Sequence, residues 1–213
     1  MADLLNIGIS GLRVHQTSLT VTGNNIANVA TEGYSRQDAT IISNSSQNVG
    51  GNWIGSGARV DSVQRIYDEF LVSQLQKDSA NFNFFETLSV NAGQVDKLLA
   101  DPSTGIQPGI ENMFGAFQAA IDDPSSLPAR QVLISESQGM VDRFHSIQDR
   151  LNDYNNIING QLGSMATQIT TLGEAIAELN VQIQFSSSSA SGNAPNDLLD
   201  KRDLAIKELS ELV

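Results

Sequence analysis

The sequence contains no cysteine among its 213 residues and only two histidines, His15 and His145. Without cysteine, neither disulfide bonds nor thiolate metal sites can hold the fold together. Both histidines lie on helical hydrophobic patterns, where we expect His15 to line an interface and His145 to face solvent. Aromatic residues make up only 6% of the chain. This composition is typical of long helices with polar faces rather than of a compact enzyme.

Basic residues are outnumbered two to one, with 12 Lys and Arg against 24 Asp and Glu, for a net charge of −12. A chain with this balance and no basic patch is a poor candidate for binding nucleic acid or an anionic membrane. It also lacks the run of about 18 apolar residues that a membrane span needs. No signal peptide is predicted, because the start is not basic and Gly8 and Ser10 interrupt any apolar core.

Motifs for catalysis are missing too. Gly55-Ser56-Gly57 lacks the further glycine and the lysine of a phosphate-binding loop, and no nucleophile elbow occurs. Asp197, Asp200 and Asp203 suggest a cation site, but we interpret them as charges that favour the start of a helix. The sequence therefore predicts no enzyme, no cofactor and no metal. A cell-wall hydrolase, the enzymatic alternative, needs paired carboxylates in a cleft, whereas the carboxylates here are scattered over helix faces.

Apolar residues spaced by three and four predict helices over 64–100, 109–122 and 128–185, and a last helix capped by Asn196 or Asp197. In the longest of these, the apolar seam runs from Phe144 to Ile183. The short helix has an apolar face of Ile110, Met113, Phe114, Phe117 and Ile121. We predict a mainly α fold, an elongated coiled-coil-like helical bundle with an N-terminal assembly helix and a small extended or β-hairpin segment.

A nearly uncharged periodic pattern occupies Met1 to Tyr34. One series repeats every seven residues, with two further members at intervening heptad positions: Leu5, Leu12, Leu19 and Ile26, with Ile9 and Ala30. A second series, Ile7, Val14 and Val21, lies roughly 200° around the helix from the first. A helix with two opposed apolar stripes needs partners on both sides. A central helix in a single-chain bundle and a helix between subunits both remain open.

From residue 34 to 63 the periodicity changes. Ala39–Ile42, Trp53-Ile54 and Arg59–Val63 favour strands, and the intervening glycines favour tight turns, so we predict a small β-hairpin or extended arm. Trp53 could be a ligand platform, but we expect it to fill a local core. The apolar seam of the last helix still runs at Val213, so we expect the sequence to be a piece of a longer protein.

Two adjacent motifs resemble the amino-terminal signature of the bacterial flagellar axial proteins, the family of rod, hook and hook-associated proteins. They read Gly23-Asn24-Asn25-Ile26-Ala27-Asn28-Val29 and Thr31-Glu32-Gly33-Tyr34-Ser35-Arg36-Gln37. Three further stretches, 50–57, 63–70 and 195–203, narrow the resemblance to the hook-associated family of the first hook–filament junction. One departure is Glu32, where members of the family often have proline.

The resemblance implies a structural protein of the flagellum outside the cell, exported by the type III apparatus without a cleaved signal peptide. It implies half of an inner coiled-coil domain at 1–33, an extended connector at 34–63 and part of a helical rod domain at 64–213. The implied partners are further copies in a ring-like layer, the hook protein, the second junction protein and an export chaperone. That chaperone would bind a carboxy-terminal region beyond this sequence.

The stripes and the resemblance together predict a subunit interface on the first helix, at Leu5, Ile7, Ile9, Leu12, Val14, Leu19, Val21, Asn24, Asn25, Ile26 and Asn28. The family motif comprises Gly33, Tyr34, Ser35, Arg36 and Gln37. Asparagine and threonine there can exchange hydrogen bonds between subunits. Because the stripes lack a partner in one copy, we expect residues 1–33 to be largely disordered before assembly.

Two other readings remain. Another axial protein, either the second junction protein or a hook or rod subunit, would share the first helix, but the long helix at 128–185 and the stretch at 50–57 argue against hook and rod. A helical tether or translocator would bind a membrane through the first helix, which carries too few Lys and Arg residues for that role.

Overall fold

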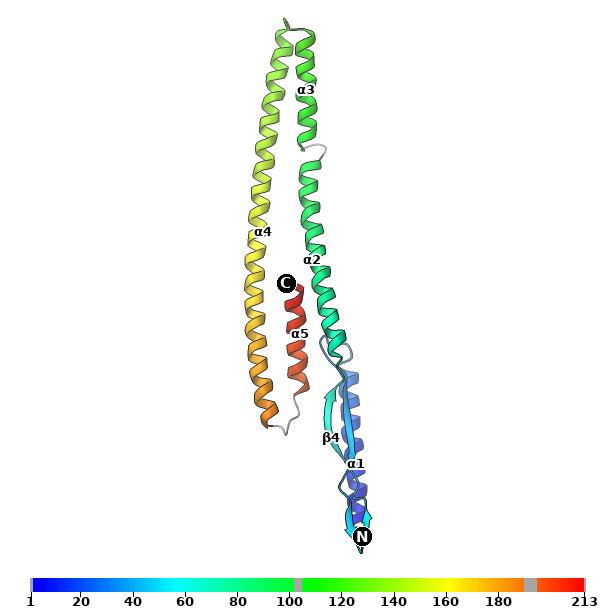
Figure 1. Ribbon diagram of the computed structural model, residues 1–213. Helices are drawn as coiled ribbons and strands as arrows, with labels where there is room; N and C mark the ends of the chain where they lie inside the picture. The colour runs from blue at the N-terminus through cyan, green and yellow to red at the C-terminus, as the bar shows by residue number, and fades with distance from the viewer. Residues whose placement is uncertain (1, 102–104, 190–194, 213) are drawn as a thin grey trace. The chain divides into compact units, whose positions relative to one another are not determined.

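The computed structural model describes residues 2–101, 105–189 and 195–212 (Figure 1). Its elements are, in chain order, α1 (Ala2–Ala27), β1 (Gln37–Ser43), β2 (Gln47–Val49), β3 (Asn52–Ile54), β4 (Ala58–Arg65), α2 (Glu69–Ala100), α3 (Ile106–Asp122), α4 (Leu127–Ser189) and α5 (Asn196–Leu212). The prediction of a mainly α fold with a small β segment is confirmed. Two compact units form, the first from Met1–Ala80 with Ile169–Val213 and the second from Asn81–Gln168. The division at 33 and 63 stays a prediction.

The second helix begins later than the hydrophobic pattern predicts. It starts at Glu69 rather than at residue 64, because β4 continues to Arg65. Asp68 then caps it, since one carboxylate oxygen accepts the backbone N–H groups of Phe70 and Leu71 at 3.0 and 3.1 Å. Such a cap satisfies donors that the first turn of a helix leaves without partners. The helix buries none of its residues.

Helix α4 runs unbroken for 63 residues, a little beyond the predicted 128–185. Within its predicted seam, Ile147 is buried, while Phe144 and Leu162 are exposed. The other seam residues are half-buried: Leu151, Tyr154, Ile158, Met165, Ile169, Leu172, Ile176, Leu179 and Ile183. In the second unit, the Tyr154 hydroxyl donates to Asn91 Oδ1 at 2.7 Å and so joins α4 to α2. The periodic seam is therefore the inward face of the helix.

Helix α3 packs through a face different from the predicted one. Gly109 and Ala116 are its buried residues, and a Cβ at Gly109 would lie 2.8 Å from Arg143 Cδ and 3.2 Å from Met140 Sδ. Small residues thus allow α3 to approach α4 closely. Of the predicted apolar face, Met113 is half-buried, whereas the others are exposed: Ile110, Phe114, Phe117 and Ile121.

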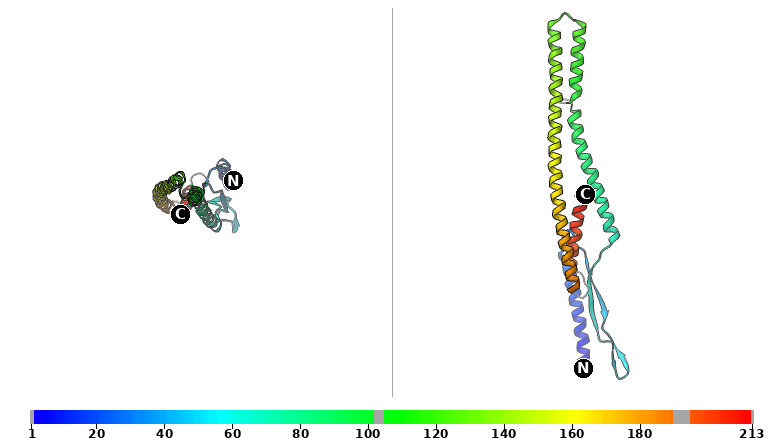
Figure 2. Two further views of the ribbon diagram at one scale, coloured as in Figure 1. Left: turned by 90° about the horizontal axis from the view of Figure 1, so that it is seen from above. Right: turned by 60° about the vertical axis from the view of Figure 1, so that its left-hand side comes forward.

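The predicted β-hairpin consists of two successive two-stranded ladders, β1–β4 and β2–β3, which are visible beside α1 in Figure 2. Antiparallel β1 and β4 pair from Gln37↔Arg65 at one end to Ser43↔Ala58 at the other. The β2–β3 hairpin follows beyond the second end, and Gly50-Gly51 closes it with φ of 62° and 86°. Two successive positive φ angles are what a tight two-residue hairpin turn requires.

Helix α1 lies against β1 and β4 of the same chain (Figures 1 and 2). Val14 is buried, and Ile7 and Val21 are half-buried. The expectation that both stripes lack a partner in one copy is therefore wrong for this stripe, which the strands cover. The predicted disorder of 1–33 rested on both stripes being bare, and the structure instead has a helix over Ala2–Ala27.

One close approach fixes α1 to β4. The Ser10 hydroxyl donates to the carbonyl of Ile7 at 2.7 Å and accepts the N–H of Ala58 at 3.2 Å. Gly57 precedes this contact with φ of 95°, and a Cβ there would collide with Ser10 Oγ. Only glycine fits this position, because both the backbone conformation and the space exclude a side chain.

Two isoleucines of α4 in the second unit test the inward face. Ile147 is 6% exposed and Ile157 is 56% exposed. Ile147→Ala should lower the free energy of unfolding by about 2–5 kcal/mol, because it leaves a cavity. Ile157→Ala, the matched control, should change it by less than about 0.5 kcal/mol. Urea denaturation measures both, and equal losses would contradict the burial of Ile147.

Candidate assembly site

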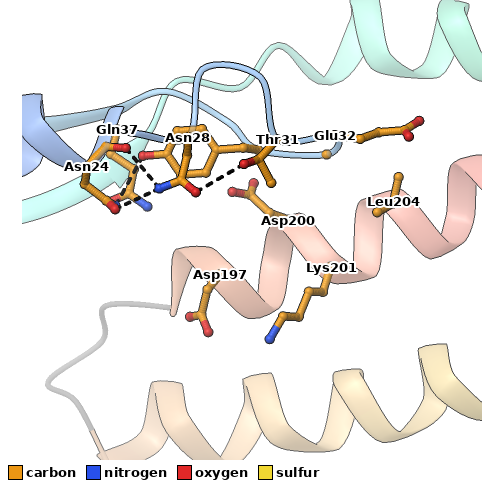
Figure 3. Close-up of a pocket in the computed structure, with 11 residues that line it drawn as sticks. Asn24, Asn28, Thr31, Glu32, Gln37, Asp197, Asp200, Lys201 and Leu204 are labelled. Carbon is orange, nitrogen blue, oxygen red and sulfur yellow. Dashed lines mark hydrogen bonds between the residues drawn. The ribbon is translucent and has the colours of Figure 1, made fainter. Parts of the chain in front are cut away.

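The predicted family motif, Gly33–Gln37, passes between the end of α1 and the start of α5 (Figure 3). These segments of the first unit enclose a pocket of about 300 Å³. Its lining comprises Asn24, Asn28, Thr31, Glu32, Gly33, Tyr34, Gln37, Asp197, Asp200, Lys201 and Leu204. The motif therefore lies where segments from the two ends of the sequence meet.

The turn that opens the motif depends on Gly33. The N–H of Thr31 donates to the carbonyl of Asn28 at 2.9 Å, and the N–H of Tyr34 donates to the carbonyl of Thr31 at 3.2 Å. Gly33 has φ of 77°, and a Cβ there would lie 3.1 Å from two carbons of Leu204. Glycine thus provides both the left-handed conformation and the room for α5.

Asn25 joins α1 to the first residue of β1. Its side-chain amide donates to the carbonyl of Gln37, and its Oδ1 accepts the N–H of Gln37, each at 2.8 Å. The side chain thereby makes the pair of backbone hydrogen bonds that a residue on a neighbouring strand would make. The same Oδ1 accepts the Tyr34 hydroxyl at 2.8 Å, and that hydroxyl accepts the Asn24 amide at 3.3 Å.

The other asparagine predicted at the subunit interface also bonds within the chain. Asn28 donates to Asn24 Oδ1 at 2.9 Å and accepts the Thr31 hydroxyl at 3.3 Å (Figure 3). The amides of all three asparagines thus hold the end of α1 against the motif. A role for them between subunits stays a prediction.

An ion cluster of Arg65, Asp200 and Asp203 ties β4 to α5. Arg65 Nη1 lies 3.1 Å from Asp200 Oδ1 and 2.7 Å from Asp203 Oδ2, and these side chains are only 8–15% exposed. The N–H of Ser35 donates to Asp200 Oδ2 at 3.1 Å, which brings the motif into the same cluster. The guanidinium carbon of Arg65 lies 4.2 Å from the centre of the Tyr67 ring. Asp203 Oδ2 accepts no hydrogen bond from the described residues, so its contact with Arg65 is ionic.

The interpretation of three aspartates as charges favouring a helix start is wrong for Asp200 and Asp203, since both face Arg65. The signal was present, because the arginine and these aspartates lie in two of the stretches that carry the resemblance. Sequence spacing alone does not show that two such distant stretches meet.

Two further contacts join α5 to the rest of the first unit. Asn196, one of the two residues expected to cap the helix, donates its side-chain amide to the carbonyl of Val63 at 2.9 Å. Lys207 Nζ lies 2.9 Å from Glu32 Oε1. This hydrogen-bonded pair lowers the pKa of Glu32 and raises the pKa of Lys207. Because Glu32 is exposed, the pair contributes little to stability.

The other predicted interface residues form the bare stripe, the uncovered apolar face of α1. We define it as Leu5, Leu12, Leu19 and Ile26, which are 68–72% exposed, with Ile9 at 38%. Four hydroxyls of the same helix, those of Thr17, Ser18, Thr20 and Thr22, donate to carbonyls four residues earlier at 2.9–3.1 Å. The sequence predicts the two opposed stripes, and the structure shows which one the chain itself covers.

Among the described residues, His, Asp and Glu side chains nowhere gather in a group able to hold a metal ion. No described helix is long and apolar enough to cross a membrane. His15 and His145 are both exposed.

Two family models match the chain. One is described as the helical domain of flagellar hook-associated protein FlgK and matches residues 92–213, and the other, described as flagella basal body rod protein, matches residues 5–34. Over its whole length the chain is 35% identical to flagellar hook-associated protein 1 of Salmonella typhimurium and 31% identical to that of Escherichia coli. It is 26% identical to the Bacillus subtilis protein of that name over 95% of the chain. The chain spans 38–41% of the length of these curated relatives.

Two arginines of β4 provide a matched test of the ion cluster. Arg65→Met should lower the free energy of unfolding by about 3–5 kcal/mol, because it leaves the nearly buried carboxylate of Asp200 without its cation and leaves Asp203 with Arg202 alone, at 3.1 Å. Arg59 pairs with Asp61 at 3.8 Å, and both side chains are at least half exposed, so Arg59→Met should cost no more than about 1 kcal/mol. Chemical denaturation compares the two variants. Similar losses would show that the cluster does not hold α5.

A pH dependence follows from Tyr34. Burial first, and the nearby Asp200 carboxylate second, raise the pKa of Tyr34 above its ordinary value of 10.0. The stabilisation is complete below about pH 10 and is lost as the pH rises toward the raised pKa, because the unfolded chain loses this proton first. The free energy of unfolding should therefore fall above about pH 10. Burial also raises the pKa of Tyr67.

Urea titrations below and above about pH 10 measure how steeply the free energy of unfolding falls with pH. Tyr34→Phe and Tyr67→Phe should each make this slope shallower, and the double variant should make it shallowest. A slope that Tyr34→Phe leaves unchanged would contradict the assignment to Tyr34.

Proposed function

Because the chain belongs to the family of flagellar hook-associated axial proteins, we propose that it is a structural, non-enzymatic subunit of the junction between hook and filament. The helical-domain model covers more than half of the chain, and identity to named relatives extends over all of it. Its place is the flagellum outside the cell, reached by flagellar export without a cleaved signal peptide. The proposed partners are further copies in a ring-like layer, the hook protein and the second junction protein. An export chaperone would bind a carboxy-terminal region beyond this sequence.

The observation that supports self-assembly is the bare stripe. Burying one such Leu or Ile side chain against a partner stabilises by about 1.5–3 kcal/mol, so the four most exposed residues contribute about 6–12 kcal/mol. Association costs about 4–15 kcal/mol in lost freedom of motion. A single pairing of stripes thus roughly balances its cost. A layer in which each copy touches several neighbours is stable where an isolated pair is not.

The distribution of charge supports the same arrangement. Residues 1–66 carry four acidic and four basic side chains, so the whole net charge of −12 falls on residues 67–213. Copies that pack through 1–66 do not repel one another there, whereas dense packing of the acidic remainder is opposed by like charge. This favours 1–33 as half of an inner coiled-coil domain, 34–63 as a connector and 64–213 as part of a helical rod domain.

Charged substitutions in the stripe test the proposal. Leu12→Asp and Leu19→Asp should leave the fold intact, because both side chains are 72% exposed, yet should abolish incorporation into flagella and reduce swimming. Thr20→Asp, also exposed, adds the same charge about 100° around the helix and is the matched control. Immunolabelling of isolated flagella and motility in soft agar provide the measurements.

The expected pattern is loss of label in both leucine variants and normal label in the threonine variant. Normal swimming and labelling in Leu12→Asp cells would reject the interface role of the stripe. Labelling along the whole hook, rather than at its end, would instead indicate a hook subunit.

A further inference from the structure

The only tryptophan of the chain, Trp53, lies in the β2–β3 hairpin and is exposed to solvent. Trp53 is 74% exposed and its neighbour Ile54 is 48% exposed. The expectation that Trp53 fills a local core is therefore wrong. Tryptophan is enriched among the side chains that dominate protein interfaces, and an exposed tryptophan gives up apolar burial that a partner can supply.

The hairpin that carries Trp53 is suited to burial against another protein. No charged residue occurs from Ala39 to Ala58, so the hairpin itself brings no charge into a contact, where burying one would cost several kcal/mol. Strands β2 and β3 pair with each other over three residues each. A two-stranded hairpin of this size is only marginally stable by itself. It gains support when its apolar side chains meet a surface.

The first unit also contains an apolar groove with no occupant among the described residues. Its apolar walls are Ile66, Tyr67, Leu71, Val72, Leu75 and Leu204. Polar side chains of the motif and of α5, together with Asp68 and Gln76, complete a volume of about 470 Å³. Leu71 and Leu75 are 61% and 59% exposed. This volume lies within the range of about 300–1,000 Å³ typical of clefts that enclose a small ligand, and it can admit an indole ring.

Trp53 cannot reach the groove of its own chain. The groove begins at the Gln37↔Arg65 end of the β1–β4 ladder, where Ile66 donates its N–H to the carbonyl of Arg36 at 2.8 Å. The hairpin follows the opposite end of that ladder (Figure 2). Seven residues of antiparallel strand span about 24 Å, which is far beyond the reach of one side chain.

We propose that Trp53 of one copy enters the apolar groove of a second copy, in a head-to-tail contact. The inference rests on the proposed self-assembly and adds a pair of surfaces to it. Tip and groove lie at opposite ends of one ladder, so a shift by about the length of that ladder, about 24 Å, brings the tip of one copy to the groove of the next. Contacts between two different patches repeat from copy to copy and generate rings or open stacks.

The contact acts as one anchor within a larger interface. A tryptophan buries about 150–250 Å², while a stable interface buries about 800 Å² on each partner. Most of the remaining area must come from other surfaces, with the bare stripe of α1 the leading one. Loss of Trp53 alone should therefore weaken self-association without abolishing it.

The cysteine-free sequence allows a direct test by disulfide cross-linking of the full chain. One preparation carries Trp53→Cys, the other carries Leu75→Cys, and each contains a single thiol. Mixed under a mild oxidant, the two should form a covalent heterodimer, while each variant alone should form none. Asn52→Cys replaces Trp53→Cys in the matched control, because residue 52 is one position away and faces the other side of the strand. Its yield should be several-fold lower.

Analytical ultracentrifugation of the same samples separates two failures. Oligomers that form while the 53–75 yield does not exceed the 52–75 yield would overturn the tryptophan contact and leave the proposed self-assembly standing. Absence of oligomers at every concentration would reject both.

The emission of Trp53 provides a second measurement on the unmodified chain. It should shift to shorter wavelength as copies associate, and Leu75→Asp should prevent that shift. A shift that persists in Leu75→Asp would place the indole elsewhere and overturn the groove assignment.

Discussion

The arrangement of the first unit depends on one charged group, the guanidinium of Arg65. It holds Asp200 and Asp203 of α5 in a site with little solvent, and the same Asp200 binds the backbone of the motif at Ser35. A buried ion pair is weak evidence for added stability, but removing one partner is strongly unfavourable because the other charge is left behind. The cluster therefore specifies how β4, the motif and α5 meet. This arrangement requires glycine at position 33, because Leu204 occupies the space that a side chain there would need.

With the motif fixed in this way, α1 has one face against the strands and one face bare. The strands supply the partner for Ile7, Val14 and Val21, while nothing among the described residues covers Leu12 or Leu19. The neutral charge of residues 1–66 permits such a face to meet copies of itself. Sequence similarity to hook-associated proteins and the physical asymmetry of α1 thus favour the same kind of assembly.

Local patterns predicted the elements well. The seven-residue repeats give α1, the seam through Ile147 gives α4, and the glycine pairs give the hairpin turn. Contacts between distant segments were not predictable, because nothing in the pattern around Arg65 names Asp200 as its partner. The apolar face of α3 that includes Phe114 was predicted to pack, yet Gly109 and Ala116 allow a closer approach to α4 than Phe114 would. Trp53 was expected to be buried because it is large and apolar, whereas the short strands β2 and β3 provide no core to receive it.

The hydroxyl groups of α1 have a mechanical consequence. Thr17, Ser18, Thr20 and Thr22 donate their protons to their own backbone, so they need no donor–acceptor match from a neighbouring helix. The side chains of the bare stripe are apolar, so a neighbour that meets it is attracted by dispersion and by the exclusion of water, neither of which has a preferred direction. In the assembly proposed above, copies that meet through the bare stripe can therefore shift slightly against one another without breaking a hydrogen bond.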